Sequence, residues 1–137
     1  MFKRALKKEF KIVDKKLRIH TVPLEDIRVD GTKVTVFLDD VNVNRWKLTF
    51  CPFQAIKITT IDCCWPETPD GEEYFTDGHY VRYISEKCDS KWIKQIRKKL
   101  ISAYNEDYTQ SSHHYVMILG DNLVEVMAWN VEIEHVN

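Results

Sequence analysis

The sequence predicts an α+β domain, in which a mainly antiparallel sheet is accompanied by one long helix at about residues 90–104. Apolar and polar residues alternate in several short runs, which is the period of a strand. Asp-Gly and Gly-Asp-Asn sequences separate neighbouring runs, as expected for hairpins. Strands and helices do not alternate regularly, which argues against a parallel, doubly wound sheet.

The bulk properties are those of one globular domain spanning residues 1–137. With 137 residues and 44% hydrophobic content, the chain can bury a core. The net charge of −1 predicts no general affinity for nucleic acid. No apolar run reaches the length of a membrane span, and the basic N-terminus lacks the apolar stretch of a secretory signal. We therefore expect a cytoplasmic protein with no membrane partner, whose four cysteines are thiols.

The first segment, residues 2–17, is ambiguous. Its apolar residues recur every three or four positions and would share one helical face: Phe2, Leu6, Phe10, Val13 and Leu17. This spacing favours an N-terminal helix packed on the sheet. Eight Lys or Arg residues within residues 1–20 leave open a basic helix that lies on a membrane or on nucleic acid.

Most of the strands are expected before residue 90. Residues 27–29 and 34–38 flank the Asp-Gly pair at 30–31 and predict a hairpin. Apolar and polar residues alternate along residues 46–50, which predicts a strand with one buried face. Cys51-Pro52 interrupts this strand, because proline cannot donate a hydrogen bond to a central ladder. Residues 56–61 form the next predicted strand, and residues 80–84 allow a further one.

The long helix has both a start signal and an apolar face. Ser90 or Asp89 can cap its N-terminus. The apolar stripe consists of Trp92, Ile93, Ile96, Leu100 and Tyr104. The helix cations lie mostly off this stripe and gather toward the C-terminal half, where the helix dipole favours them.

A closing hairpin is predicted from residues 114–119 and 123–129, followed by a last strand at 131–133. Within the second run, alternation places Glu125 on the same face as Met127 and Trp129. Desolvation there would raise the pKa of Glu125 and could mark a general acid. We favour the simpler interpretation, in which Glu125 reaches solvent or pairs with a cation.

The strongest functional signal is the acidic loop, residues 66–78. It contains five carboxylates and no Lys or Arg, together with two of the four prolines and two of the four glycines. Such turn residues predict a loop held up by a rigid scaffold, where binding usually resides. Aromatic residues among the carboxylates are typical of a protein-binding patch with a basic partner. The candidate binding residues are Trp65, Glu67, Asp70, Glu72, Glu73, Tyr74 and Asp77.

The alternative is a thiol- or metal-dependent enzyme that uses Cys63 or Cys64 with His79, or with the pair His113 and His114. Neighbours on a strand point to opposite faces, so only one member of each pair can face a given partner. A metal site needs three or four converging ligands, and no local pattern supplies them. Phosphate-loop and dinucleotide motifs are absent from the sequence. We therefore expect no catalytic residue, no metal, no cofactor and no direct contact with nucleic acid.

The last 80 or so residues resemble a group of small stand-alone bacterial domains. The resemblance is carried by Asp62 at a strand end, residues 90–93 opening a helix, and residues 114–116, Asp121 and residues 124–126 closing a hairpin. Several such domains are encoded near polymorphic or contact-dependent toxins and act as immunity proteins. The resemblance implies a cytosolic protein that binds and neutralises a toxin domain. Such toxins are often basic nucleases, for which an acidic surface is a match. Homodimer formation through an edge strand is a third hypothesis.

Overall fold

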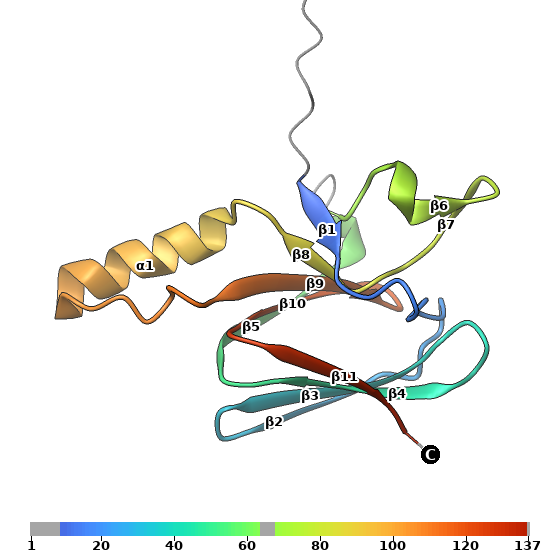
Figure 1. The fold of residues 1–137 in the computed structure, drawn as a ribbon, viewed down its shortest axis with the longest axis horizontal. Coiled ribbons are helices and arrows are strands. Elements are labelled where there is room, and N and C mark those ends of the chain that lie inside the picture. Colours follow the sequence, from blue (N-terminus) through green and yellow to red (C-terminus); the bar gives the residue numbers. More distant parts are fainter. Residues whose placement is uncertain (1–8, 64–67, 137) are drawn as a thin grey trace, which may run out of the picture.

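Two antiparallel sheets lie face to face and form the body of the molecule (Figure 1). The structure, a computed structural model, describes residues 9–63 and 68–136. One sheet has the strand order β1-β8-β9-β10-β5 and the other β11-β4-β3-β2. The strands are β1 (Phe10–Ile12), β2 (Asp26–Asp30), β3 (Lys33–Asp39), β4 (Arg45–Phe50), β5 (Phe53–Thr60), β6 (Phe75–Thr76), β7 (His79–Tyr80), β8 (Ser85–Lys87), β9 (His113–Leu119), β10 (Asn122–Ala128) and β11 (Val131–His135). The helices are the short η1 (Ile61–Cys63) and η2 (Glu72–Tyr74) and the longer α1 (Lys91–Tyr104).

The predicted α+β class and its hairpins are confirmed. Strands β2 and β3 pair across the predicted Asp-Gly turn, where Gly31 has a φ of 57°. Strands β9 and β10 pair across the second predicted turn, where Gly120 has a φ of 60°. Glycine enters this left-handed region without the steric penalty of a side chain, so both turns follow directly from local sequence.

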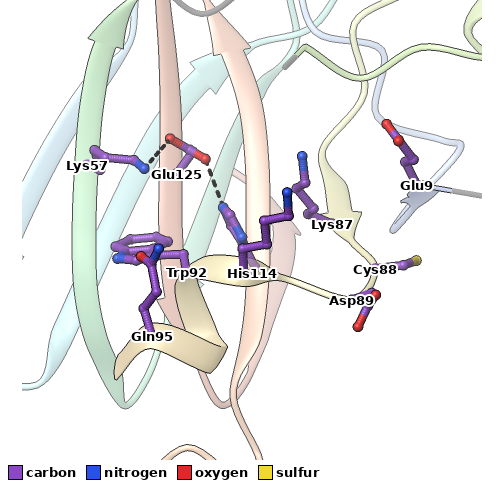
Figure 2. A pocket seen from close by; sticks show the side chains of 10 residues that line it. Glu9, Lys57, Lys87, Cys88, Asp89, Trp92, Gln95, His114 and Glu125 are labelled. Atoms are coloured by element: carbon purple, nitrogen blue, oxygen red, sulfur yellow. Dashed lines mark hydrogen bonds and ion pairs between the residues drawn. The ribbon is translucent and has the colours of Figure 1, made fainter. Parts of the chain in front are cut away.

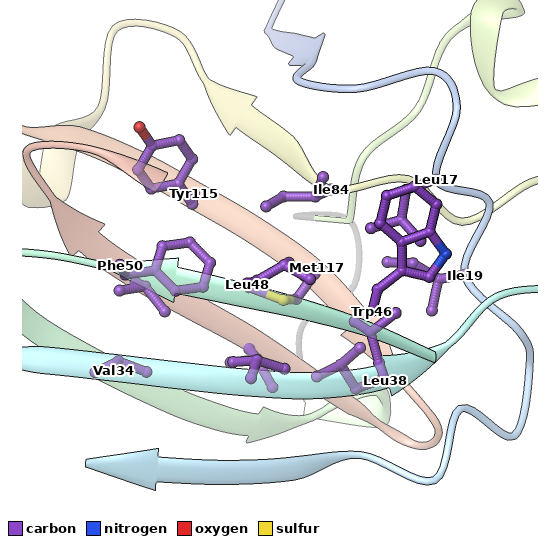
Figure 3. Close-up of a cluster of buried hydrophobic side chains, with 14 of the residues drawn as sticks. Leu17, Ile19, Val34, Leu38, Trp46, Leu48, Phe50, Ile84, Tyr115 and Met117 are labelled. Atoms are coloured by element: carbon purple, nitrogen blue, oxygen red, sulfur yellow. The ribbon is translucent and has the colours of Figure 1, made fainter. Parts of the chain in front are cut away.

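The main core lies between the two sheets (Figure 3). Alternate residues of β3 and β4 point inward, and Val36, Leu38 and Leu48 are completely buried. They meet inward-facing residues of β9 and β10, among them Met117 and Val126. The period of two along each strand supplies one apolar row per strand, and stacking the sheets removes these rows from water.

The chain crosses between the two sheets at one corner. Strand β4 leads into β5 through Cys51-Pro52, and β10 leads into β11 through residues 129–130. The two crossings are hydrogen-bonded to each other, because Cys51 donates its N–H to the carbonyl of Asn130 and Trp129 donates to the carbonyl of Pro52. The predicted interruption at Pro52 is therefore where the strand changes sheet.

Strands β9 and β10 are buried on both faces, which explains their nearly continuous apolar sequence. On the outer face, Val116, Ile118 and Leu123 form a second apolar cluster with Tyr74 and Tyr83. Farther along the same face, His114 and Glu125 are also buried and face the start of α1. The outer face therefore carries two separate coverings, one from residues 68–83 and one from the start of the helix.

The prediction of an N-terminal helix over residues 2–17 is wrong for the part that the structure describes. Phe10–Ile12 is strand β1, which pairs with β8, and residues 13–17 are not helical. Phe10 is buried in the outer cluster, whereas Leu17 is buried in the main core. A helix would present these two residues on one face, but the fold uses them on opposite sides of the sheet. Residues 1–8 lie outside the described residues.

Helix α1 confirms the predicted boundaries, but only its start lies against the sheet. It projects from the body, and none of its residues is fully buried (Figure 1). Ser90 caps the helix, accepting a hydrogen bond from the N–H of Ile93 at 3.2 Å. The return segment after the helix is held through Arg97, whose Nε donates to Thr109 Oγ1 at 3.1 Å and lies 3.2 Å from Asp107 Oδ2. We call α1 and residues 105–112 the arm.

Candidate functional site

The described part of the acidic loop folds into a short hairpin. After η2, β6 and β7 pair through Phe75 with Tyr80 and through Thr76 with His79. The turn between these strands is Asp77-Gly78, with φ values of 51° and 78°, which suits this residue pair. We call residues 68–80 the acidic hairpin. Its exposed carboxylates are those of Asp70, Glu72, Glu73 and Asp77, and it contains no Lys or Arg.

Tyr74 corrects the predicted binding set. Its side chain is completely buried in the outer cluster, so it is a core residue and cannot be a surface anchor. The Tyr74 hydroxyl lies 2.7 Å from Ser85 Oγ, and its ring packs against the ring of Tyr83 at 6.1 Å. Burial raises the pKa of Tyr74, partly offset by the hydrogen bond with Ser85. Tyr74 therefore ties the acidic hairpin to β8.

Two exposed aromatic side chains take the position that the sequence assigned to Tyr74. Phe75 and Tyr80 contact each other with ring centroids 5.6 Å apart, and both are partly exposed. The hydroxyl of Tyr80 donates to the carbonyl of Pro69 at 2.6 Å, which closes the loop. Burial raises the pKa of Tyr80 to about 12, so this donor keeps its proton at neutral pH.

A cavity of ≈ 540 Å³ adjoins the acidic hairpin, within the range of about 300–1,000 Å³ that is typical of small-molecule pockets. We call it the apolar cavity. Its lining is Ile61, Thr68, Pro69, Asp70, Phe75, Tyr80, Arg82 and Ile118. The Arg82 side chain is positioned by its Nη1, which donates to the carbonyl of Gly120 at 2.9 Å, and it adds one positive charge to the lining. The cavity thus combines aromatic and aliphatic walls with the carboxylate of Asp70 at its edge.

Three predicted residues, Cys64, Trp65 and Glu67, lie outside the described residues. For the rest of the thiol and metal hypothesis, the structure shows separate partners. Cys63 accepts a hydrogen bond from Thr60 Oγ1, and His113 Nδ1 lies 3.0 Å from Glu86 Oε2. His79 lies on β7 at the surface. Within residues 9–63 and 68–136, no group of three or more His, Cys, Asp or Glu residues could hold a metal ion.

A buried polar array joins the start of α1 to the outer face of β9 and β10. Ser90 Oγ lies 2.7 Å from His114 Nδ1, and His114 Nε2 lies 2.9 Å from Glu125 Oε1. The second oxygen of Glu125 is 3.3 Å from the Nζ of Lys57, which itself lies over the ring of Trp92 (Figure 2). All three members of the Ser90–His114–Glu125 array are nearly inaccessible to solvent.

The hydrogen bonds determine where the protons of the array lie when His114 is neutral. Burial raises the pKa of Glu125, but the hydrogen bond from His114 and the charge of Lys57 outweigh it and lower the pKa below its ordinary value. Glu125 is therefore ionised and only accepts, so His114 Nε2 carries the ring proton. Nδ1 is then an acceptor, and the Ser90 hydroxyl donates to it. The predicted pairing of Glu125 with a cation is found, and the predicted rise in its pKa is not.

A second cavity, of ≈ 450 Å³, opens onto this array (Figure 2). We call it the polar cavity. Its lining is Glu9, Lys57, Lys87, Cys88, Asp89, Lys91, Trp92, Gln95, His114 and Glu125. Three lysines and three carboxylates are among these residues, so the lining favours neither anionic nor cationic ligands.

The sequence singled out each member of the array separately, but it did not predict that the three side chains contact one another. Either Ser90 or Asp89 was expected as the cap, and Glu125 as a carboxylate in an apolar strand. The missing signal was the register of β9 and β10, in which Glu125 pairs with Val116 and Met127 pairs with His114. His114 and Glu125 are therefore diagonal neighbours on one face, within reach of each other.

Comparisons with known proteins do not assign a function to either site. No protein family, no curated protein and no solved structure matched this chain. Among the residues that the structure describes, no helix is both long and apolar enough to cross a bilayer.

Proposed function

We propose that this chain is a protein-binding domain that docks a basic protein on its acidic hairpin. The observation that carries the proposal is the group of exposed carboxylates of residues 70–77 beside the apolar cavity. Following the resemblance to immunity proteins, we propose that the partner is a basic, nuclease-like toxin domain, which this chain binds and neutralises in the cytoplasm.

The acidic hairpin is supported by the core, which favours binding without a large ordering cost. The buried Tyr74 ring and its contact with Ser85 hold the hairpin to β8. The N–H of Val81 donates to the carbonyl of Tyr74 at 2.6 Å, and Tyr80 holds Pro69 at the other end. Its carboxylates are therefore presented by a segment with several fixed points.

The apolar cavity supplies the binding affinity that exposed carboxylates alone do not. Exposed ion pairs contribute little, about 0–1 kcal/mol each, so charge mainly accelerates and orients the encounter. Most of the affinity of protein interfaces comes from a few side chains that fill well-packed hollows. Phe75 and Tyr80 form such a hollow with Ile118. An apolar side chain, or the aliphatic part of a Lys or Arg, fits there with the carboxylates around it.

Charge reversal on the acidic hairpin tests this proposal. The double variant Glu72→Lys/Glu73→Lys is expected to weaken binding about tenfold or more and to reduce its salt dependence, since the encounter loses its electrostatic steering. The measurement is titration calorimetry at two salt concentrations, against the purified C-terminal domain of any large secreted protein that is found encoded immediately upstream.

Glu132→Lys/Glu134→Lys is the matched control. These two glutamates are also exposed, but they lie on β11 of the other sheet. We expect this control to retain the affinity and the salt dependence of the unmodified chain. Equal effects of the two double variants would show that overall charge, and not the acidic hairpin, determines binding.

A further inference from the structure

The Ser90–His114–Glu125 array has no part in docking on the acidic hairpin. It lies where α1 meets the sheet, whereas β6 and β7 extend from the other side of the body (Figure 1). A buried histidine held between a hydroxyl and a carboxylate needs an explanation of its own. Such an array can simply secure the helix start, or it can activate the hydroxyl.

The three side chains are arranged as a nucleophile (Ser90), a general base (His114) and a carboxylate that orients the base (Glu125). The Ser90 hydroxyl donates to His114 Nδ1 at 2.7 Å, and Glu125 accepts from the opposite ring nitrogen at 2.9 Å. The carboxylate holds the tautomer in which Nδ1 can take a proton, and it stabilises the imidazolium that would form. Lys57 lies 3.3 Å from Glu125, and the edge of the His114 ring contacts Trp92, which fixes the ring.

We propose that Ser90 is the nucleophile of an acyl-transfer site that accepts a small carboxylic ester, with His114 as its general base and Glu125 as a positioning residue. The proposal is independent of the binding function above. It concerns a separate cavity and separate side chains.

The proposed reaction uses only these groups and water. Ser90 Oγ forms a bond to the ester carbonyl carbon while its proton passes to His114 Nδ1. The bond from that carbon to the alcohol oxygen then breaks, and His114 returns the proton to the leaving alcohol. A water molecule next gives a proton to His114 while its oxygen bonds to the acyl carbon. The bond from that carbon to Ser90 Oγ then breaks, His114 returns the proton to Oγ, and the carboxylic acid is released.

The polar cavity limits the substrate. Asp89 and Lys91, the residues on both sides of Ser90, line it together with His114 and Glu125. Ser90 itself is 6% exposed and is not among the lining residues, so a substrate must be small enough for its carbonyl to reach past Asp89 and Lys91 to the Ser90 hydroxyl. The balanced charges of the lining favour a neutral ester. In the first helical turn the N–H of Ile93 already donates to Ser90 Oγ, so the N–H groups of Lys91 and Trp92 are the candidates for stabilising the oxyanion.

Reactivity of Ser90 toward methanesulfonyl fluoride, a small electrophile, tests the activation directly. The folded wild-type chain is expected to gain one methanesulfonyl group on Ser90, located by peptide mass spectrometry. Ser85 is an internal control, because it is also buried, at 0% exposed against 6% for Ser90, but its hydroxyl lies 2.7 Å from Tyr74 instead of a histidine. If Ser90 is labelled no faster than Ser85, the array only holds the helix start and the proposal is overturned.

Two variants distinguish a role of His114 as general base from a purely structural role. His114→Gln is expected to slow labelling of Ser90 about 100-fold or more, since general-base catalysis typically contributes 10²–10⁴-fold. Ser112→Ala, a half-buried serine bonded to Gln54, is expected to leave the rate unchanged. An unchanged labelling rate in His114→Gln would overturn the role of His114. The wild-type comparison of Ser90 with Ser85 stands even if His114→Gln does not fold.

Ester hydrolysis tests the substrate class. Release of 4-nitrophenol from 4-nitrophenyl acetate is expected to exceed the uncatalysed rate and to fall to it in Ser90→Ala. Labelling of Ser90 without catalysed hydrolysis of this ester would overturn the acyl-transfer assignment. Glu125→Gln is expected to lower the hydrolysis rate and alter its pH profile, which a purely structural carboxylate would not do.

Discussion

Asp40 illustrates how a single buried charge is stabilised in this molecule. Its carboxylate is 5% exposed and accepts three hydrogen bonds, from Trp46 Nε1 at 2.8 Å and from the N–H groups of Asn42 and Asn44 at 2.8 and 2.9 Å. Burial alone would raise the pKa of Asp40. The three donors outweigh burial and hold its pKa below the ordinary value.

We predict that Asp40→Asn destabilises the fold in a pH-dependent way. Because the folded-state pKa is lowered, the ionised carboxylate stabilises the fold above the ordinary value of 3.8, and this contribution is lost as the pH falls through the folded-state pKa. Hydrogen bonds to charged groups contribute about 1.5–3 kcal/mol, and the variant should lose about this much at pH 7. Urea unfolding between pH 7 and pH 3 measures the difference.

Glu132→Gln on the exposed side of β11 is the control for this measurement and should change the free energy of unfolding by less than about 0.5 kcal/mol. A loss in Asp40→Asn that remained the same down to pH 3 would mean that the lowered pKa of Asp40 does not contribute to stability.

At the scale of elements, the arm differs from the rest of the molecule. Helix α1 has no fully buried residue, and Tyr104 in its last turn is 70% exposed. The helix ends at Asn105, whose φ of 54° is left-handed and whose N–H donates to the carbonyl of Ile101 at 3.0 Å. With so little burial, local features such as this cap determine how firmly the helix is held.

We predict that Asn105→Ala loosens the arm without unfolding the body. An alanine in the left-handed region costs about 1–2 kcal/mol, whereas Asn105→Gly keeps the cap without that penalty. Amide hydrogen exchange should become faster in α1 and remain unchanged in β9 for the alanine variant, and neither should become faster for the glycine variant. Faster exchange of β9 to the same extent would show that arm and body unfold as one unit.

At the scale of the whole molecule, stability resides between the two sheets. Leu48 is completely buried there, packed among residues of β3, β4, β9 and β10 (Figure 3). Ile58 on the edge strand β5 is 53% exposed, although its sequence alternation resembles that of a buried row. The same kind of aliphatic side chain thus occupies two very different environments.

We predict that Leu48→Ala lowers the free energy of unfolding by about 2–5 kcal/mol, because it leaves a cavity between the sheets. Ile58→Ala removes a side chain of the same size at the surface and should cost less than about 1 kcal/mol. Chemical unfolding of both variants measures the two losses. Similar losses would mean that the inter-sheet core does not dominate stability.

Local sequence was sufficient wherever neighbours in the chain determine conformation. It predicted the turns at Gly31 and Gly120, the interruption at Pro52, the Ser90 cap and the α+β class, because turn geometry, proline chemistry and capping act over a few residues. It also predicted exposed carboxylates at residues 70–77, since acidic residues among turn formers remain in water.

Only the tertiary structure decided what covers each face. It made Phe10–Ile12 a strand, buried Tyr74 against β8, and left α1 projecting from the body. It also joined Ser90 to His114 across 24 residues of sequence and His114 to Glu125 across 11. Periodicity specifies that a run has an apolar side, but the segment that packs on that side comes from elsewhere in the chain, so pairing and burial follow from the packing of the whole molecule.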